Sequence, residues 1–253
     1  MRIFLKTEDE IILLRAASQL ATRALIEVGR HVVPRLALSH LRDKVVYAVM
    51  RTVPTESNSG KEALSSDTEF TFFVNGAYIE PSLEGECMLC EGDWLTVNCW
   101  VCLDGYYSFG AHTFIVGSSQ DDEPMISTLR DMLRQVVRRA SAGHSIKEMS
   151  RTVYSLHSHD PYVLQKTFGH GVGRNRVENP ILRMNPGVND TVLLKEGMCL
   201  VIALAFKHGR SHLIKPRLMH ESTSHNPFVP FGTTVVVRPG RPEILTSFET
   251  IVK

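Results

Sequence analysis

Four of the five cysteines stand in two closely spaced pairs, and cysteine thiolates are zinc ligands. Cys87 and Cys90 form the first pair and Cys99 and Cys102 the second, with the spacing C-x2-C-x8-C-x2-C. Eight intervening residues are few for a zinc ribbon. Cys99 and Cys102 also fall in a run typical of a strand, where residues three apart face opposite sides. We therefore expect free thiols, with structural zinc as the less favoured alternative, and an odd cysteine count argues against a complete disulfide framework.

The composition is that of an ordinary globular protein. The chain has 253 residues, of which 43% are hydrophobic and 22% charged, and this length suits one large α/β domain or two small ones. The net charge of +1 provides no general attraction to nucleic acid or anionic membranes. No apolar run approaches the roughly 18 to 20 residues that span a bilayer, and residues 1–10 lack a signal-peptide core. We expect a cytoplasmic protein without a membrane segment.

Helical periodicity predicts two helices near the start of the chain. Thr7 and Glu10 have the spacing of a capping box, and apolar residues recur at helical intervals after them. The first helix is expected over residues 8–31 and a shorter one over residues 39–50. The polar, turn-rich residues 54–68 predict a mobile surface loop.

β-like runs follow that loop and return in the last third of the chain. The expected strands are residues 70–74, 94–103, 106–116, 192–194, 200–206 and 233–237. Asp104 and Gly105 are a typical two-residue turn, so they predict a tight hairpin.

Two further helices are expected between these groups of strands. Apolar spacing predicts a helix over residues 126–140, and a capped helix follows over residues 145–157. Arg130, Arg134 and Arg138 share a face of the first of them. A solvated basic face is the simpler interpretation, and a patch for a partner is the alternative.

A short internal repeat connects the two groups of strands. Residues 91–98 and 196–203 both follow the pattern E-G-x-x-L-x-[VI], about 105 positions apart. Two strands entered by the same turn suggest two structurally related halves.

Five segments, taken in chain order, resemble methionine aminopeptidases. They are the helix start K-T-E-D-E-I at residues 6–11, the hairpin over 92–117, G-H-G-V-G-R at 169–174 with Glu178 and Pro180 after it, L-K-E-G-M at 194–198, and E-I-L-T at 243–246. The chain is thus similar to the peptidase M24 family, to which methionine aminopeptidases and creatinase belong. The resemblance implies one domain over residues 1–253 with the α/β pita-bread fold, in which two pseudo-symmetric αβ halves surround a central antiparallel sheet.

The resemblance also implies where metal ligands should lie. Family members hold two divalent ions with two aspartates, one histidine and two glutamates, whose hard oxygen donors suit such ions. In chain order these positions fall on Asn98, Phe109, His170, Ala203 and Gly232. Only the histidine is retained, and a single imidazole cannot hold a pair of ions. The resemblance therefore implies no metal and no other cofactor.

A misaligned strand does not restore the missing carboxylates. The carboxylates nearest to Asn98 are Asp93 and Asp104, and residues 198–220 contain no Asp or Glu. We therefore expect no methionine aminopeptidase activity.

A metal-free site favours a binding protein. Asn98 and Trp100 should point the same way, because residues two apart on a strand share a face. Trp100 and Phe109 would add aromatic bulk, whereas Ala203 and Gly232 leave space opposite. We expect a pseudoenzyme that binds a small molecule or a protein, as metal-free relatives such as the N-terminal module of a histone-chaperone subunit do. Nucleic acid is disfavoured, and the oligomeric state stays open.

The alternative is a metal-independent enzyme similar to creatinase. His170 would be its acid/base, because imidazole titrates near neutrality. Glu178, Glu80 and His112 are the groups expected nearby as orienting or ligand-binding residues. Glu80 and Val177 occupy the positions of two further pocket histidines of the family, and the loss of the second one counts against catalysis.

Overall fold

The computed structural model describes residues 2–53, 64–117, 124–157, 163–164, 166–185, 192–207 and 228–247. Its helices are α1 (Glu8–His31), α2 (Leu38–Thr52), the 3-10 turn η2 (Pro81–Leu83), α3 (Pro124–Arg138) and α4 (Ile146–His157). Its strands are β1 (Glu69–Val74), β2 (Ala77–Ile79), β3 (Trp94–Leu103), β4 (Tyr106–Ile115), β5 (Val163–Leu164), β6 (Thr167–Gly171), β7 (Glu178–Arg183), β8 (Cys199–Lys207), β9 (Phe228–Val236) and β10 (Glu243–Ile244).

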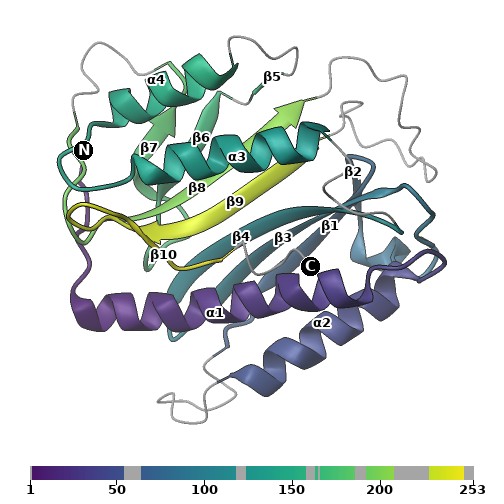
Figure 1. Cartoon of the computed structure of the whole chain (residues 1–253). Helices are drawn as coiled ribbons and strands as arrows, with labels where there is room; N and C mark the ends of the chain where they lie inside the picture. The colour runs from purple at the N-terminus through teal and green to yellow at the C-terminus, as the bar shows by residue number, and fades with distance from the viewer. Residues whose placement is uncertain are drawn as a thin grey trace.

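All these strands belong to one antiparallel sheet (Figure 1). The order across it is β2-β1-β3-β4-β9-β8-β6-β7, with β5 on β8 and β10 on β9. The N-terminal half provides β1 to β4 with α1 and α2, and the C-terminal half provides β5 to β10 with α3 and α4. The halves join where β4 meets β9, through the pair Ala111 and Gly232.

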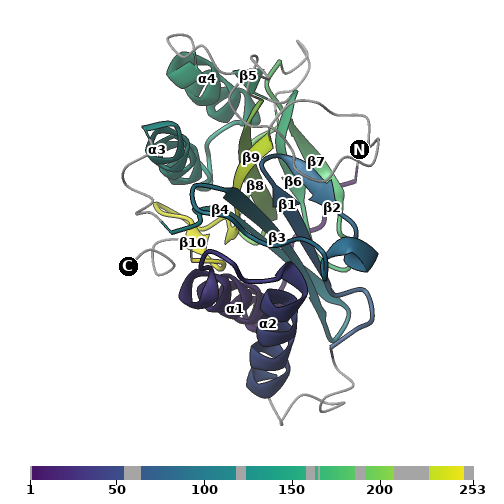
Figure 2. The same cartoon turned by 90° about the vertical axis from the view of Figure 1, so that its right-hand side faces the viewer.

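Both helix pairs cover the same face of the sheet, as Figure 2 shows from the side. Val97 on β3, Phe231 on β9 and Leu204 on β8 are buried in one apolar cluster with residues of α1 and α3. The strand registers place these three side chains on one face, because directly paired residues point the same way. The residues that alternate with them therefore face away from the helices.

The first two helices form as their local patterns predict. Thr7 Oγ1 accepts a hydrogen bond from the Glu10 N–H, and the Glu10 carboxylate accepts one from the Thr7 N–H, so the capping box is confirmed. The bounds of α1 match the expected residues 8–31, and α2 is longer than expected by one or two residues at each end. None of the described helices combines the length and apolarity needed to cross a membrane.

The hairpin and the internal repeat are also confirmed. β3 and β4 pair along their whole length around Asp104 and Gly105, which have φ of 48° and 78°. Gly92 and Gly197 have φ of 77° and 82° and enter β3 and β8 by equivalent turns. Positive φ favours glycine at such positions, which explains why both copies of the repeat contain it.

Several expectations differ from the structure. Leu193 forms only an isolated bridge to Ser145, so the expected strand over 192–194 is wrong. Arg130 is buried, so it does not belong to a solvated basic face. Leu64 bridges to Leu103 at the end of β3, so the last part of the expected mobile loop is attached to the sheet, and residues 54–63 lie outside the described residues. The short strands β2, β5, β6, β7 and β10 were not predicted.

Candidate functional site

Four strands place one row of residues on the sheet face that the helices leave uncovered. Asn98 on β3 pairs with Ala111 on β4, Ala111 pairs with Gly232 on β9, and Gly232 pairs with Ala203 on β8. Directly paired residues point to the same face of a sheet. The predicted positions Asn98, Ala203 and Gly232 are therefore brought together from segments far apart in the sequence, and we call this row with the flanking Trp100, Phe109 and His170 the sheet-face site.

Phe109 fills the middle of the sheet-face site. A Cβ placed on Gly232 would lie 2.6 Å from Phe109 Cε1 and 3.0 Å from the Ala203 Cβ. Real Cβ atoms essentially never come closer than the larger of these two distances. A side chain at Gly232 therefore does not fit while the Phe109 ring keeps its place. The Trp100 ring packs on Phe109 with centroids 4.8 Å apart. Aromatic bulk thus occupies the space above the glycine.

Thr234 holds Phe109 where β4 and β9 separate. Its Oγ1 accepts a hydrogen bond from the Phe109 N–H and donates one to the Phe109 carbonyl, both at 2.9 Å. Thr246 Oγ1 donates to the same carbonyl. The backbone at Phe109 is therefore fixed by side chains of the other half, a role that no sequence motif indicated for Thr234.

Asn98 has an unpaired hydrogen-bond acceptor in the site. Its side chain is half-buried, and its Oδ1 has no hydrogen-bond partner among the described residues. A buried polar atom without a partner costs free energy, so such an atom calls for a ligand or water.

His170 lies at the other side of the site, on β6 opposite Val201. Its ring stacks on Trp100, with centroids 6.1 Å apart and an interplanar angle of 8°. Nδ1 donates to the Gly171 carbonyl at 2.8 Å, because a carbonyl oxygen only accepts. Burial lowers the pKa of His170, and the Gly171 hydrogen bond offsets part of that effect. Neutral His170 therefore presents Nε2 as an acceptor.

Glu178 is engaged elsewhere. Its Oε2 accepts from Lys6 Nζ at 2.5 Å, and its Oε1 accepts from the Asn175 N–H at 3.2 Å. The Lys6 and Glu178 side chains are only 4% and 5% exposed. Glu178 therefore does not orient or assist His170 as expected, because both of its carboxylate oxygens already accept from other donors.

Arg176 covers the Trp100 side of the site. Its guanidinium lies 5.7 Å from the Trp100 ring centroid and 5.8 Å from that of Tyr107. It pairs with Glu69 at 2.8 Å and donates to the Asp67 carbonyl. The Tyr107 hydroxyl donates a hydrogen bond to the Asp67 carboxylate, which raises the pKa of Tyr107 to about 12. No local sequence pattern indicates that Arg176 reaches Glu69 on β1.

Three predicted site residues lie apart from this group. His112 alternates with Ala111, points to the helix side, and is fully buried between the rings of Phe114 and Phe231, each 4.6 Å away. The expectation that it lines the same pocket as Phe109 is therefore wrong. The Glu80 side chain is exposed just after β2, and β1 separates β2 from β3. Val177 is 57% exposed.

The cysteines remain free thiols in the structure. Cys99 is buried on the helix side of β3, whereas Cys102 lies three residues further along the same strand. Burial raises the pKa of Cys87 to about 11 and also raises that of Cys99. In the part of the chain that the structure describes, no group of three or more His, Cys, Asp or Glu residues could hold a metal ion.

Known proteins are similar to this chain in sequence and in fold. A profile of metallopeptidase family M24 matches residues 12–239. A methionine aminopeptidase of Helicobacter pylori is 29% identical over 225 residues, which cover 85% of this chain and 87% of the relative. The crystal structure of methionine aminopeptidase from Thermotoga maritima superposes with a TM-score of 0.79 at 20% identity, over 97% of this chain and 100% of that one.

A further solved structure has this fold as part of a larger protein. The N-terminal domain of FACT complex subunit SPT16 from chickpea has a TM-score of 0.69 at 17% identity, over 96% of this chain and 58% of that one. The profile spans most of the present sequence, and the solved structures with this fold include methionine aminopeptidases and prolidases. The chain therefore belongs to metallopeptidase family M24 and has its pita-bread fold.

Proposed function

We propose that this chain is a metal-free member of family M24 that binds a small molecule or a protein partner and has no methionine aminopeptidase activity. The observation that carries the proposal is the Phe109 ring, which occupies the space into which a side chain at Gly232 would extend. At the positions that the family resemblance assigns to metal ligands, this chain has an amide, an aromatic ring, a methyl group and a glycine beside one imidazole.

These residues do not fit a pair of divalent ions. A dinuclear hydrolytic site needs several carboxylates, which bridge the ions and offset their charge. The row Asn98, Ala111, Gly232 and Ala203 contains none. Glu178, the buried carboxylate nearest in sequence to His170, is paired with Lys6. No catalytic step through a metal follows from this arrangement.

The same residues suit a neutral ligand with a flat face. Trp100 and Phe109 provide an aromatic surface, and the Asn98 Oδ1 and the His170 Nε2 provide two acceptors beside it. Ligand sites are commonly apolar with a few such convergent polar atoms. A ligand with N–H or O–H donors would satisfy the buried Asn98 oxygen.

Metal content and activity test this proposal directly. We expect the purified protein to contain far less than one equivalent of transition metal and to release no methionine from Met-Ala-Ser with added cobalt, manganese or iron. Thermal unfolding should not shift with these metals, because only real affinity for the folded state stabilises it. Two equivalents of bound metal together with methionine release would overturn the proposal.

A reconstruction variant makes the test independent of a negative result. Asn98→Asp, Phe109→Asp, Ala203→Glu and Gly232→Glu together should create metal-dependent stabilisation of about 2–3 kcal/mol at a metal concentration near 100 times its Kd. The matched control has Asn at position 109 and Gln at positions 203 and 232, with Asn98 unchanged. It fills the same volume without charge, so it should show no metal response.

A metal-independent enzyme is the second candidate. The observation in its favour is His170, whose Nδ1 is fixed by Gly171 and whose lowered pKa keeps Nε2 available as a base near neutral pH. The test is a panel of creatine-like and dipeptide substrates with native protein and His170→Ala. This candidate requires a turnover that falls by about 100-fold or more in the variant. Activity unchanged by His170→Ala would exclude His170 as the acid/base.

A further inference from the structure

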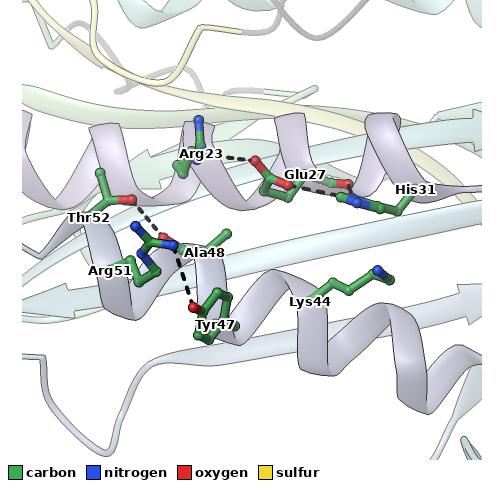
Figure 3. A pocket seen from close by; sticks show the side chains of 8 residues that line it. All are labelled: Arg23, Glu27, His31, Lys44, Tyr47, Ala48, Arg51 and Thr52. Atoms are coloured by element: carbon green, nitrogen blue, oxygen red, sulfur yellow. Dashed lines mark hydrogen bonds and ion pairs between the residues drawn. The ribbon is translucent and has the colours of Figure 1, made fainter.

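A charged groove lies between α1 and α2, away from the sheet-face site. Figure 3 shows side chains of α1 facing those of α2 across it. We call it the α1–α2 groove; it has a volume of about 490 Å³, and its charged or aromatic lining residues are Arg23, Glu27, His31, Lys44, Tyr47 and Arg51.

Positive charge dominates the α1–α2 groove. Arg23, Lys44 and Arg51 contribute three permanent cations, against the single carboxylate of Glu27. Arg30 adjoins it and also pairs with Glu27, at 2.8 Å. The whole chain has a net charge of only +1, so this excess is local. It favours an anionic partner.

The buried carboxylate of Glu27 organises the α1 wall. It forms an ion pair with Arg23 Nη2 at 2.9 Å and lies 3.5 Å from His31 Nδ1. On the α2 wall, Lys44 has no ion pair among the described residues. Arg51 contacts the exposed Tyr47, with its guanidinium 5.6 Å from the ring centroid. The α2 cations are therefore available to a partner, whereas Arg23 is already partly neutralised.

The spacing of the available cations selects the form of the partner. Lys44 and Arg51 are seven positions apart on one helix, or about 10 Å along its axis. Two anionic groups at a similar interval along one segment can contact both at once. In an extended polyproline-type segment every third residue returns to the same side after about 9 Å. Carboxylates at that interval would meet Lys44 and Arg51, and the intervening side chains would pack on Tyr47.

We propose that the α1–α2 groove binds an extended acidic segment of a partner protein, with carboxylates three residues apart. Nucleic acid fits less well, because its binding surfaces are usually strongly basic, with a pI above about 9 for the domain, whereas this chain has a pI near 7.7. The proposal goes beyond the sheet-face site and shares no residue with it. The two can therefore fail separately.

The test is fluorescence anisotropy with the full chain and a labelled 12-residue peptide that has glutamate at every third position among proline and alanine. A peptide with glutamine at those positions is the charge control. We expect binding of the glutamate peptide that weakens with salt, and no binding of the glutamine peptide. Absence of binding by the glutamate peptide at low salt would overturn the proposal.

Two double variants locate the binding. Lys44→Glu with Arg51→Glu should weaken it by about 10-fold or more. Arg139→Glu with Arg151→Glu makes the same charge change at exposed positions of the other half, and it should alter the affinity by about two-fold or less. Equal losses in both variants would show non-specific attraction and refute the groove. If a 12-nucleotide single-stranded RNA bound more tightly than the glutamate peptide and lost this binding in the groove variant, the proposed protein segment would be wrong and the groove would be a nucleic-acid site. Circular dichroism verifies that each variant folds.

Discussion

The sheet-face site and the α1–α2 groove handle charge in opposite ways. On the sheet face, Phe109 fills the space above Gly232, and the row that pairs across four strands contains no ionised group. In the groove, one buried carboxylate, Glu27, holds a set of cations at the surface. The sheet-face site is uncharged, and a bulky aromatic ring occupies it. The α1–α2 groove has more positive than negative charge, and its own carboxylate does not neutralise the excess. The interaction surface that we propose on the helices is therefore independent of the site on the sheet.

A charge forced into the sheet face should have the largest effect. Gly232→Glu meets the Phe109 ring and the Ala203 methyl and buries an unpaired carboxylate, so we expect a loss of about 3–5 kcal/mol in the free energy of unfolding. Urea denaturation measures it. Combined with Phe109→Ala, the same substitution should cost clearly less than it does alone. Additive costs would show that the ring does not occupy that space.

Neutralising the groove carboxylate should have a moderate effect. Glu27→Gln removes the negative charge that Arg23 and Arg30 share, so we expect a loss of about 1–2 kcal/mol by chemical denaturation. Asp131→Asn is the matched control, because Asp131 also pairs with an arginine but is 62% exposed. It should cost about 0.5 kcal/mol or less. Equal costs would mean that Glu27 does not organise the groove.

Reversing the available groove cations should barely affect folding. Lys44 and Arg51 are exposed, and the contact of Arg51 with Tyr47 is a surface one. We expect Lys44→Glu with Arg51→Glu to change the free energy of unfolding by about 1 kcal/mol or less. A larger loss, seen in thermal or urea unfolding, would make these residues structural and weaken their assignment to a partner.

The titration of His170 should give the smallest effect. Because burial lowers its pKa below the ordinary value of 6.5, the unfolded chain binds a proton more readily than the folded one just below that pH. Stability from this group is therefore present above about pH 6.5 and is lost as the pH falls through the folded-state pKa. Comparing native protein with His170→Gln from pH 7.5 to 5 isolates it. The stability advantage of the native protein over the variant should shrink as the pH falls, and an advantage that grows towards low pH would contradict the assigned direction.

Local patterns were sufficient for the elements whose start or turn depends on neighbouring residues. The capping box at Thr7 and Glu10, the hairpin turn at Asp104 and Gly105, and the helix starting at the Ser145 cap all formed where expected. Each depends on hydrogen bonds within a few residues of the chain or on the backbone freedom of glycine. The apolar run at 192–194 misled because burial alone does not show whether a strand partner is present.

The sequence by itself determined the family, the bounds of α1 and the absence of carboxylates at the positions that the resemblance assigns to metal ligands. Only the tertiary structure decided that Phe109 lies over Gly232, that Glu178 pairs with Lys6 172 positions away, and that His112 faces the helices. Strand register and helix packing set these contacts. They depend on which distant segments meet, and a one-residue change of register would place every side chain of a strand on the other face.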